Sequence, residues 1–589
     1  MNPYDTTYRC APILARVLLA VTFLPCCNFE ASARVALLTS QIGYEPGESI
    51  RAMARADEAD GIPDGARFQL IDAEGAATHE GKVFSSGYTW GVHWWTMEIP
   101  RQTSAGEYRI RVAMGTREGL TSDPISIKPG TRWNQCFETI AFDFLETRAK
   151  LARSGKGWKD CGSDLQELSS HVVTVDCLCD ILEKAPDLTS SAQKERIMAQ
   201  IVRGMGYIAM LQDRAMELGL GGGPVVHESR QSDLTTGNTV MAAMIFARTS
   251  RLLKGTDAAS ADDYRSRAVR AYQWIKQNGP IIPDEDPLFF APVHGAPAGS
   301  KPPPGQWMTR DLLMMARAAL ELHKAGLPGY QDEAIRHASA AMERQISKAD
   351  AEGGLHGHFW LYDDFSSFGG ARFSEKAVIH CGAWSREGRI YNKGGHYPHH
   401  LIPLIEMLAL WPDHADARAW KRCLRDFAYG YFLPACKSSP FLILPNGYYR
   451  NAGLQHFGSW YHGQSSMYSL AAILALEFEN LFKDPVFHDL AVANVQWVAG
   501  LNCGWRTEKD DPWLAYSLVE GIGHRSWKGW SGIKGSTING FSASPQFKIQ
   551  PADAVSDKPA HFDDEDYIAH SLPFLAASAR LESRRRAGD

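Results

Sequence analysis

The chain is 589 residues long, with 44% hydrophobic residues, 22% charged residues and a formal net charge of −6. This length allows two domains and a large buried core, and the charge balance argues against nucleic acid or an anionic membrane surface as a partner. The composition leaves the oligomeric state open between a monomer and a homodimer.

The first 33 residues have the pattern of a secretory signal peptide. Arg9 and Arg16 precede an apolar run over residues 17–25, and the small residues 31–33, Ala-Ser-Ala, follow it. A charged start, a short apolar run and small residues at the cleavage site are typical of leaders removed on export. No later segment reaches the roughly 20 apolar residues of a transmembrane helix. We therefore expect a periplasmic or secreted protein, cut near Ala33, without membrane association after cleavage.

Residues 34–129 form the first predicted domain, a small antiparallel β-sandwich. Short strand-like segments alternate there with Gly, Pro and Asp turns, which is typical of such domains. The predicted strands are Val35–Leu38, Ser49–Ala54, Arg67–Asp72, Trp90–Ile99 and Gly106–Met114.

Residues 130–589 form the second predicted domain, which is helical. Apolar residues recur there at three- and four-residue spacing, which predicts amphipathic helices. Twelve helices in succession, with no convincing strand pair between them, predict paired helices wound into an (α/α)6 barrel. The expected helices cover residues 135–152, 164–183, 194–219, 232–253, 262–277, 307–326, 330–348, 396–410, 415–431, 463–482, 485–500 and 567–582.

Three long loops interrupt the helical pattern, and we expect them to carry the chemistry. They are residues 279–305, rich in Pro and Gly, residues 348–395, rich in His and aromatic residues, and residues 501–564, which end in an acidic cluster. Loops of this length inside a compact domain are usually functional or disordered. Their aromatic content favours function.

Two acidic segments open predicted helices at distant positions of the chain. Residues 563–567 read Asp-Asp-Glu-Asp-Tyr, and residues 158–164 read Trp-Lys-Asp-Cys-Gly-Ser-Asp. Two carboxyl groups brought together by a helical fold suggest glycoside hydrolysis, in which one protonates the leaving oxygen and the other handles water. Glu565 is the candidate acid. A carboxylate at a helix start also complements the helix dipole without any catalytic role.

Several motifs carry a resemblance that covers nearly the whole chain after the leader. Residues 40–46, Ser-Gln-Ile-Gly-Tyr-Glu-Pro, residues 497–502, which end in Gly-Leu-Asn, and the loops 519–523 and 538–545 resemble glycoside hydrolase family nine. The members are inverting, cellulase-type enzymes with an immunoglobulin-like N-terminal module. The resemblance implies an immunoglobulin-like sandwich at residues 34–129, a catalytic (α/α)6 barrel, and hydrolysis of a β-linked polysaccharide or oligosaccharide with inversion.

The resemblance also implies catalytic residues, with a departure at the base. Glu565 falls on the family's acid. The family's Asp-Ala-Gly-Asp motif aligns with residues 160–163, so Ser163 occupies the position of the usual base, and a serine hydroxyl cannot be a general base near neutral pH. Asp160 is therefore the leading candidate to position and deprotonate water. Asp164 is its rival, and a helix N-cap explains Asp164 equally well.

Aromatic and histidine residues of the loops are the candidate substrate-binding residues, because flat apolar faces suit stacking on sugar rings. The family's Pro-His-His-Arg stretch is replaced here by residues 524–530, so contacts made there would differ. The candidates are Trp360, Trp384, His396, His399, Trp460, His524 and Arg525. In the first domain, alternating aromatics are expected to pack against the barrel rather than bind glycan; they are Tyr88, Trp90, Trp94 and Trp95.

We expect no required cofactor and no metal ligand among the site residues. Crowded histidines near residues 356–400 leave zinc as an alternative, and aspartates at 510–511 and 553–557 leave structural calcium as another, although no loop has a recognisable calcium spacing. The eight cysteines after the leader are expected to be mostly buried thiols. The turn at residues 227–230, His-Glu-Ser-Arg, either lines the cleft or is an ordinary turn.

Two other functions stay open on the sequence alone. One is a polysaccharide lyase, since toroidal helical folds also host eliminations in which Tyr or His removes a proton beside a uronate. The other is a sugar-binding protein that has lost activity, which Ser163 at the position of the base favours.

Overall fold

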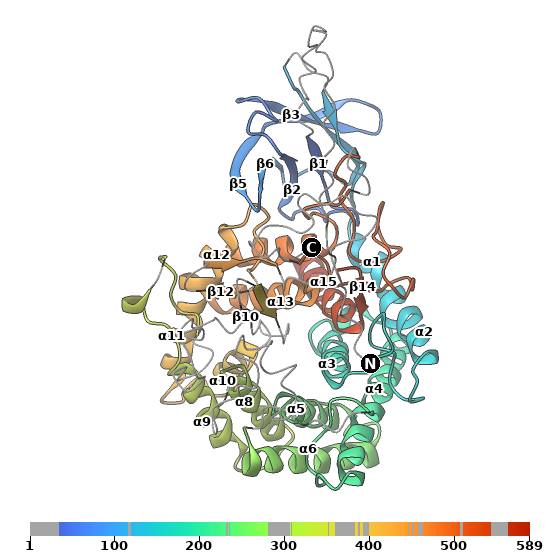
Figure 1. Ribbon diagram of the computed structural model, residues 1–589, viewed down its shortest axis with the longest axis vertical. Coiled ribbons are helices and arrows are strands. Elements are labelled where there is room, and N and C mark those ends of the chain that lie inside the picture. Colours follow the sequence, from blue (N-terminus) through green and yellow to red (C-terminus); the bar gives the residue numbers. More distant parts are fainter. Residues whose placement is uncertain are drawn as a thin grey trace, which may run out of the picture.

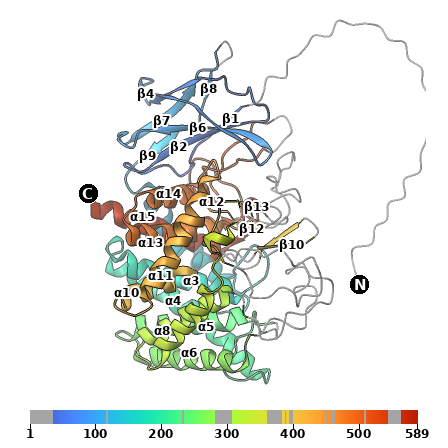
Figure 2. The ribbon, with the colours of Figure 1, turned by 90° about the vertical axis from the view of Figure 1, so that its left-hand side faces the viewer.

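The structure is a computed structural model that describes residues 35–588, with gaps at 116–118, 231–233, 235, 281–306, 308, 352, 360–382, 387–388, 393–399, 446, 450–452, 458–462, 507–510 and 543–562. A β domain sits on one side of a larger helical domain, and the two are stacked along the longest axis of the molecule (Figures 1 and 2).

Two antiparallel sheets form the N-terminal domain. One has the strand order β1-β2-β6-β5, and the other has the order β4-β3-β7-β8, with β9 also paired to β7. Apolar side chains such as Ala54, Leu70 and Ile110 are fully buried in the domain's own core. The strands are β1 (Ala36–Leu38), β2 (Ile50–Ala56), β3 (Arg67–Asp72), β4 (Ala77–Lys82), β5 (Phe84–Thr89), β6 (Val92–Ile99), β7 (Gly106–Val112), β8 (Leu120–Thr121) and β9 (Ile125–Ile127).

Helices dominate the chain from Thr131 onward. Short pairs of strands, β10 (Ala383–Arg386) with β11 (Arg389–Asn392) and β12 (Gly447–Tyr449) with β13 (Gly453–Gln455), interrupt them. The helices are α1 (Thr131–Glu138), α2 (Leu145–Lys150), α3 (Leu168–Lys184), α4 (Ser191–Glu217), α5 (Thr236–Leu253), α6 (Ala258–Asn278), α8 (Thr309–Lys324), α9 (Tyr330–Met342), α10 (Ile402–Leu410), α11 (Ala417–Phe427), α12 (Leu433–Lys437), α13 (Ser465–Phe482), α14 (Val486–Val498) and α15 (Ile568–Gly588).

Among these helices, an inner ring closes on itself. Its members contact one another in the order α3, α5, α8, α10, α13, α15 and back to α3, and each packs against an outer helix: α4, α6, α9, α11, α14 and α1, respectively. The ring is seen in Figure 1. The predicted β-sandwich followed by an (α/α)6 barrel is confirmed, whereas the exact division of the chain near residue 129 stays a prediction.

The burial of each helix explains its position in the barrel. In α13 the run Ala471–Leu476 is fully buried, because an inner helix is enclosed on all sides. In the outer helix α11, the buried residues recur at three- and four-residue spacing, which leaves a polar face toward solvent; they are Ala417, Trp420, Cys423, Leu424 and Phe427.

Buried contacts join the sandwich to the barrel. The Arg55 guanidinium donates to the Cys503 carbonyl at 2.8 Å and lies 3.7 Å from the centroid of the Trp513 ring. Trp90 and Trp94 both pack against Phe441 of the barrel, as predicted. Of the other two aromatics in that prediction, Trp95 packs in the core of the sandwich and Tyr88 is 60% exposed.

Within the described residues, no helix is long and apolar enough to cross a membrane. The cysteines of this part of the chain are free and buried, as predicted; they are Cys136, Cys161, Cys177, Cys179, Cys423, Cys436 and Cys503. Cys381 lies outside the described residues.

Candidate active site

Two segments that are far apart in the sequence meet at one end of the barrel. The loop of residues 158–167 precedes α3, and the short strand β15 (Asp566–Tyr567) precedes α15. Cys161 and Tyr567 are partners in an antiparallel β-bridge, and the Ile568 N–H donates to the Asp160 carbonyl at 2.8 Å. β15 also pairs with β14 (Thr537–Ile538). These backbone bonds bring the candidate acid close to the loop that carries Asp160 and Asp164, the candidates to deprotonate water. The two segments meet at the N-termini of two inner helices.

Glu565 lies in a largely dry setting, with 7% of the residue exposed. The Tyr567 hydroxyl donates to Glu565 Oε2 at 3.0 Å, and Cys161 and Ser163 also bond to the carboxyl group. Burial raises the pKa of Glu565 above its usual range, and these hydrogen bonds offset part of that rise. A general acid must hold its proton until the leaving group needs it, so the raised pKa suits that role.

The aspartates beside Glu565 build the frame around it. Asp566 forms an ion pair with Arg148 in which both side chains are fully buried. Asp564 Oδ1 accepts from the indole N–H of Trp530 at 2.7 Å. The main cause of the raised pKa of Glu565 is its burial, and not the negative charge of the neighbouring aspartates.

Asp160, a residue of the loop of residues 158–167, is fully buried. Its Oδ2 accepts from the backbone N–H of Glu167 at 2.8 Å, and no N–H or O–H group of the described residues donates to Oδ1. Burial, and then the charge of Glu167, raises the pKa of Asp160 to about 7. Asp160 thus holds the loop in shape and sits next to a second carboxyl group.

Ser163 and Asp164 point to different surroundings. The Ser163 hydroxyl lies 2.9 Å from the Cys161 sulfur, beside Glu565. The side chain of Asp164 is 83% exposed, and its nearest charged partner is Lys159 at 3.8 Å. Asp164 does not cap α3, because Glu167 is the residue at the N-cap position.

Glu167 is a carboxylate that the sequence reasoning missed. Its Oε1 lies 2.9 Å from His227 Nε2, and the two side chains are 26% and 23% exposed. The charge of Glu167 raises the pKa values of both Asp160 and Tyr567, so the three groups are neighbours. Its position directly before a helix, in the loop that carries Asp160, is the sequence signal that could have found it.

Comparison with solved structures finds this architecture in several glycoside hydrolase family 9 enzymes. A metagenome-derived glycoside hydrolase family 9 endoglucanase is 17% identical, covers 93% of this chain and 99% of its own, and has a TM-score of 0.63. Bacteroides ovatus GH9 is 13% identical with 94% and 99% coverage and a TM-score of 0.59. AaCel9A in complex with cellobiose-like isofagomine is 14% identical with 93% and 99% coverage and a TM-score of 0.60.

The chain has the fold of the family nine glycoside hydrolases. No protein-family model matches the sequence, and no curated protein matches it either. The likeness is therefore one of structure, at identities between 13% and 17% for these three neighbours.

Within the family nine fold, Trp530 stands beside the candidate acid. It is 43% exposed, although its indole N–H is fixed by Asp564. A Cβ atom on Gly162 would lie 2.6 Å from the Trp530 Cβ, so the absence of a side chain at 162 lets the indole pack over the Asp160 loop. This exposed ring is a candidate platform for a sugar.

The predicted substrate-binding residues fall into two groups. Arg525 donates to Asp123 of the sandwich at 2.7 Å and 3.1 Å, and His524 Nε2 lies 3.9 Å from the same carboxyl group. The structure thus places both residues at the junction of the two domains. Four others, Trp360, His396, His399 and Trp460, lie outside the described residues, as does the side chain of Trp384 in β10.

Among the described residues, no group of three or more His, Cys, Asp or Glu side chains could hold a metal ion. Asp510 and the aspartates at 553–557 lie outside those residues, and structural calcium stays a prediction.

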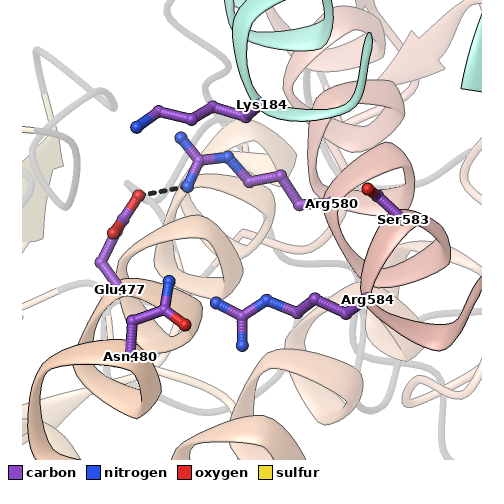
Figure 3. A pocket seen from close by; sticks show the side chains of 6 residues that line it. All are labelled: Lys184, Glu477, Asn480, Arg580, Ser583 and Arg584. Carbon is purple, nitrogen blue, oxygen red and sulfur yellow. Dashed lines mark hydrogen bonds and ion pairs between the residues drawn. The ribbon is translucent and has the colours of Figure 1, made fainter. Parts of the chain in front are cut away.

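A cavity of about 120 Å³ lies elsewhere, between the far ends of α3, α13 and α15 (Figure 3). Arg580 in its wall is paired with Asp180 and Glu477, and Arg584 donates to Glu479. Arg580 is twelve residues along α15 from Ile568, or about 18 Å at about 1.5 Å per residue. The cavity is thus at the opposite end of the barrel from Glu565.

Proposed function

We propose that this chain is a glycoside hydrolase that cleaves a β-linked glucan with inversion at the anomeric carbon. The observation that carries the proposal is the meeting of Glu565 with the Asp160 loop at one end of a family nine barrel. Neighbours of this fold are endoglucanases, and one is in complex with a cellobiose-like compound. The proposal names a β-1,4-glucan or its oligosaccharides as the first substrates to test.

Glu565 is the proposed acid. It gives its proton to the glycosidic oxygen as the bond from that oxygen to C1 breaks, while a water molecule attacks C1 from the opposite face and loses a proton to a carboxylate on the Asp160 loop. Asp160 holds that loop through Oδ2 and is the predicted water-side carboxylate. The exposed Trp530 ring stacks on a sugar beside the cleavage point.

Export to the periplasm or the medium is part of the proposal and rests on the sequence of residues 1–33, which lie outside the described residues. A polymeric β-glucan is met outside the cytoplasm, so the proposed substrate and the proposed location agree. The buried, free state of the described cysteines depends neither on the proposed substrate nor on the proposed location.

Mass spectrometry of products formed in ¹⁸O-labelled water tests the proposal. Cello-oligosaccharides incubated with the chain after leader removal should yield shorter sugars that carry one ¹⁸O atom at the new reducing end. Acidic β-glycans are included, because products that absorb in the ultraviolet and carry no label would identify a polysaccharide lyase instead. Binding without any product would identify an inactive sugar-binding protein.

A further inference from the structure

The resemblance to family nine places Ser163 at the position of the usual base, so another group of this chain must take the proton from water if the proposed function holds. Asp160 is fully buried, and one of its oxygens is engaged by a backbone N–H. Asp164 is 83% exposed and faces Lys159. The third carboxylate of the same loop, Glu167, is partly exposed and lies next to Asp160 and Tyr567.

The main chain of Glu167 is fixed on both sides. Its N–H donates to Asp160 Oδ2 at 2.8 Å, and its carbonyl lies 2.8 Å from His171 Nδ1. His171 is itself clamped, because its Nε2 accepts from the Trp158 N–H at 3.1 Å and its ring stacks on Tyr207. The side chain of Glu167 therefore starts from a defined point at the N-terminus of α3.

His227 holds the carboxyl group of Glu167. The two side chains meet at 2.9 Å, and the Leu168 N–H donates to the His227 carbonyl at 2.9 Å, so the two residues are tied through both backbone and side chain. The turn that carries His227 is closed by a bridge between Val226 and Leu234. The Glu167 side chain is 26% exposed, so it is partly open to water, while the contact with His227 limits the rotation of its carboxyl group.

We propose that Glu167 is the catalytic base of this chain and that His227 is its positioning residue. The inference rests on the proposed function, since it assigns one step of that reaction. A water O–H bond breaks, its proton goes to the Glu167 carboxylate, and the oxygen forms a bond to C1. The bond from C1 to the glycosidic oxygen breaks, and that oxygen takes the proton of Glu565. Asp160 serves this step by holding the backbone of Glu167.

Azide rescue of Glu167→Gln tests the assignment on an aryl β-cellobioside. Glutamine keeps the shape and an acceptor for His227 but cannot take a proton, so turnover should fall by about 10²–10⁴-fold. Azide needs no base, and it should restore turnover and give the α-glycosyl azide, because it attacks from the side opposite to the leaving group. Glu479→Gln is the matched control, since Glu479 forms a Glu–His pair with His488 at 3.3 Å, away from this loop, with similar exposure.

Asp160→Asn and Asp164→Asn are assayed in parallel. Rescue by azide of either of these variants but not of Glu167→Gln overturns the inference and names that aspartate as the base. Turnover of Glu167→Gln within about threefold of the unmodified chain also overturns it, as does a loss that azide does not restore. Thermal unfolding checks that each variant folds, and Glu167→Asp, which keeps a shortened carboxylate, should lose less turnover than Glu167→Gln.

The His227→Gln variant separates positioning from chemistry. A positioning role predicts a lower kcat with little change in KM and no rescue by azide, since the base is still present. An unchanged kcat contradicts the role. If the unmodified chain releases no labelled sugar from any β-glucan, the proposed function itself fails, which differs from an active chain whose Glu167→Gln variant keeps its activity.

Discussion

The backbone N–H of Ile568 donates to the carbonyl of Asp160 at 2.8 Å, which ties the first residue of the last inner helix to the loop before the first one. Glu565 is three residues before Ile568, so the same bond holds the candidate acid close to the loop of residues 158–167. Inverting glycosidases need about 6.5–9.5 Å between acid and base. In the proposed mechanism, this backbone link between the two segments serves to keep the distance between the acid and the base constant.

Replacement of Glu565 by glutamine should remove the acid and leave the other groups of the site in place. We expect cello-oligosaccharide hydrolysis to fall by about 10²–10⁴-fold, because the leaving alcohol can no longer be protonated. An aryl β-cellobioside with an acidic phenol should lose much less, since that phenolate leaves unaided. Initial rates on the two substrates provide the check, and equal losses on both would argue against Glu565 as the acid.

Asp160 should make stability depend on pH. Its pKa is raised from 3.8 to about 7, so the folded chain keeps a proton that the unfolded chain releases, and the free energy of unfolding should fall as pH rises from about 4 to about 7. Below about pH 4 the contribution of Asp160 to the free energy of unfolding is constant, and above about pH 7 that contribution has been lost completely. Asp160→Asn should remove this part of the decline. Urea unfolding of the unmodified chain and of Asp160→Asn between about pH 4 and about pH 7 measures this difference. If the free energy of unfolding falls equally with pH in both, the buried and protonated state of Asp160 is contradicted.

The ion pair of Arg148 and Asp566 should be strongly coupled. Arg148→Met leaves a fully buried carboxylate without its counter-charge, which costs about 3–5 kcal/mol. The double variant Arg148→Met/Asp566→Asn should recover part of that loss. Arg196→Met is the control, because Arg196 is 45% exposed in its pair with Glu138 and should cost at most about 1 kcal/mol. Denaturant titration compares the three, and additive losses would contradict a direct pair.

Gly162 should determine the position of the Trp530 ring, the candidate platform for a sugar. Gly162→Ala places a methyl group against the Trp530 Cβ, which must move, so KM for cello-oligosaccharides should rise roughly two- to tenfold with less change in kcat. Trp530→Ala should act in the same direction. Gly206→Ala is the control, because nothing lies within 4 Å of its added Cβ. An unchanged KM in both site variants would remove Trp530 from the substrate-binding surface.

The fold could be predicted well where burial leaves a pattern. The expected helix at 463–482 is observed as Ser465–Phe482, because its apolar spacing is continuous, and buried and exposed residues alternate along the predicted strand β7. The strands β4 and β5 were not predicted. Both lie at sheet edges with mostly exposed side chains, so no apolar alternation marks them.

The candidate site could be predicted only where a motif carries it. Glu565 and Asp160 were found from short acidic segments, and the structure brings them together. Glu167 was missed, because its importance depends on His227, which is sixty residues away and meets it only in the folded chain. Arg525 is charged and lies in a motif-like loop, but its partner Asp123 belongs to the other domain, and no local pattern reveals that contact.

The most direct test of the central claim is proton NMR of cello-oligosaccharide hydrolysis, recorded from the first minutes before the products mutarotate. Inverting hydrolysis of a β-linked glucan predicts that the α-anomer of the new reducing end appears first and that its signal is lost in the Glu565→Gln variant. First appearance of the β-anomer, or an equal signal from the variant, would contradict the account.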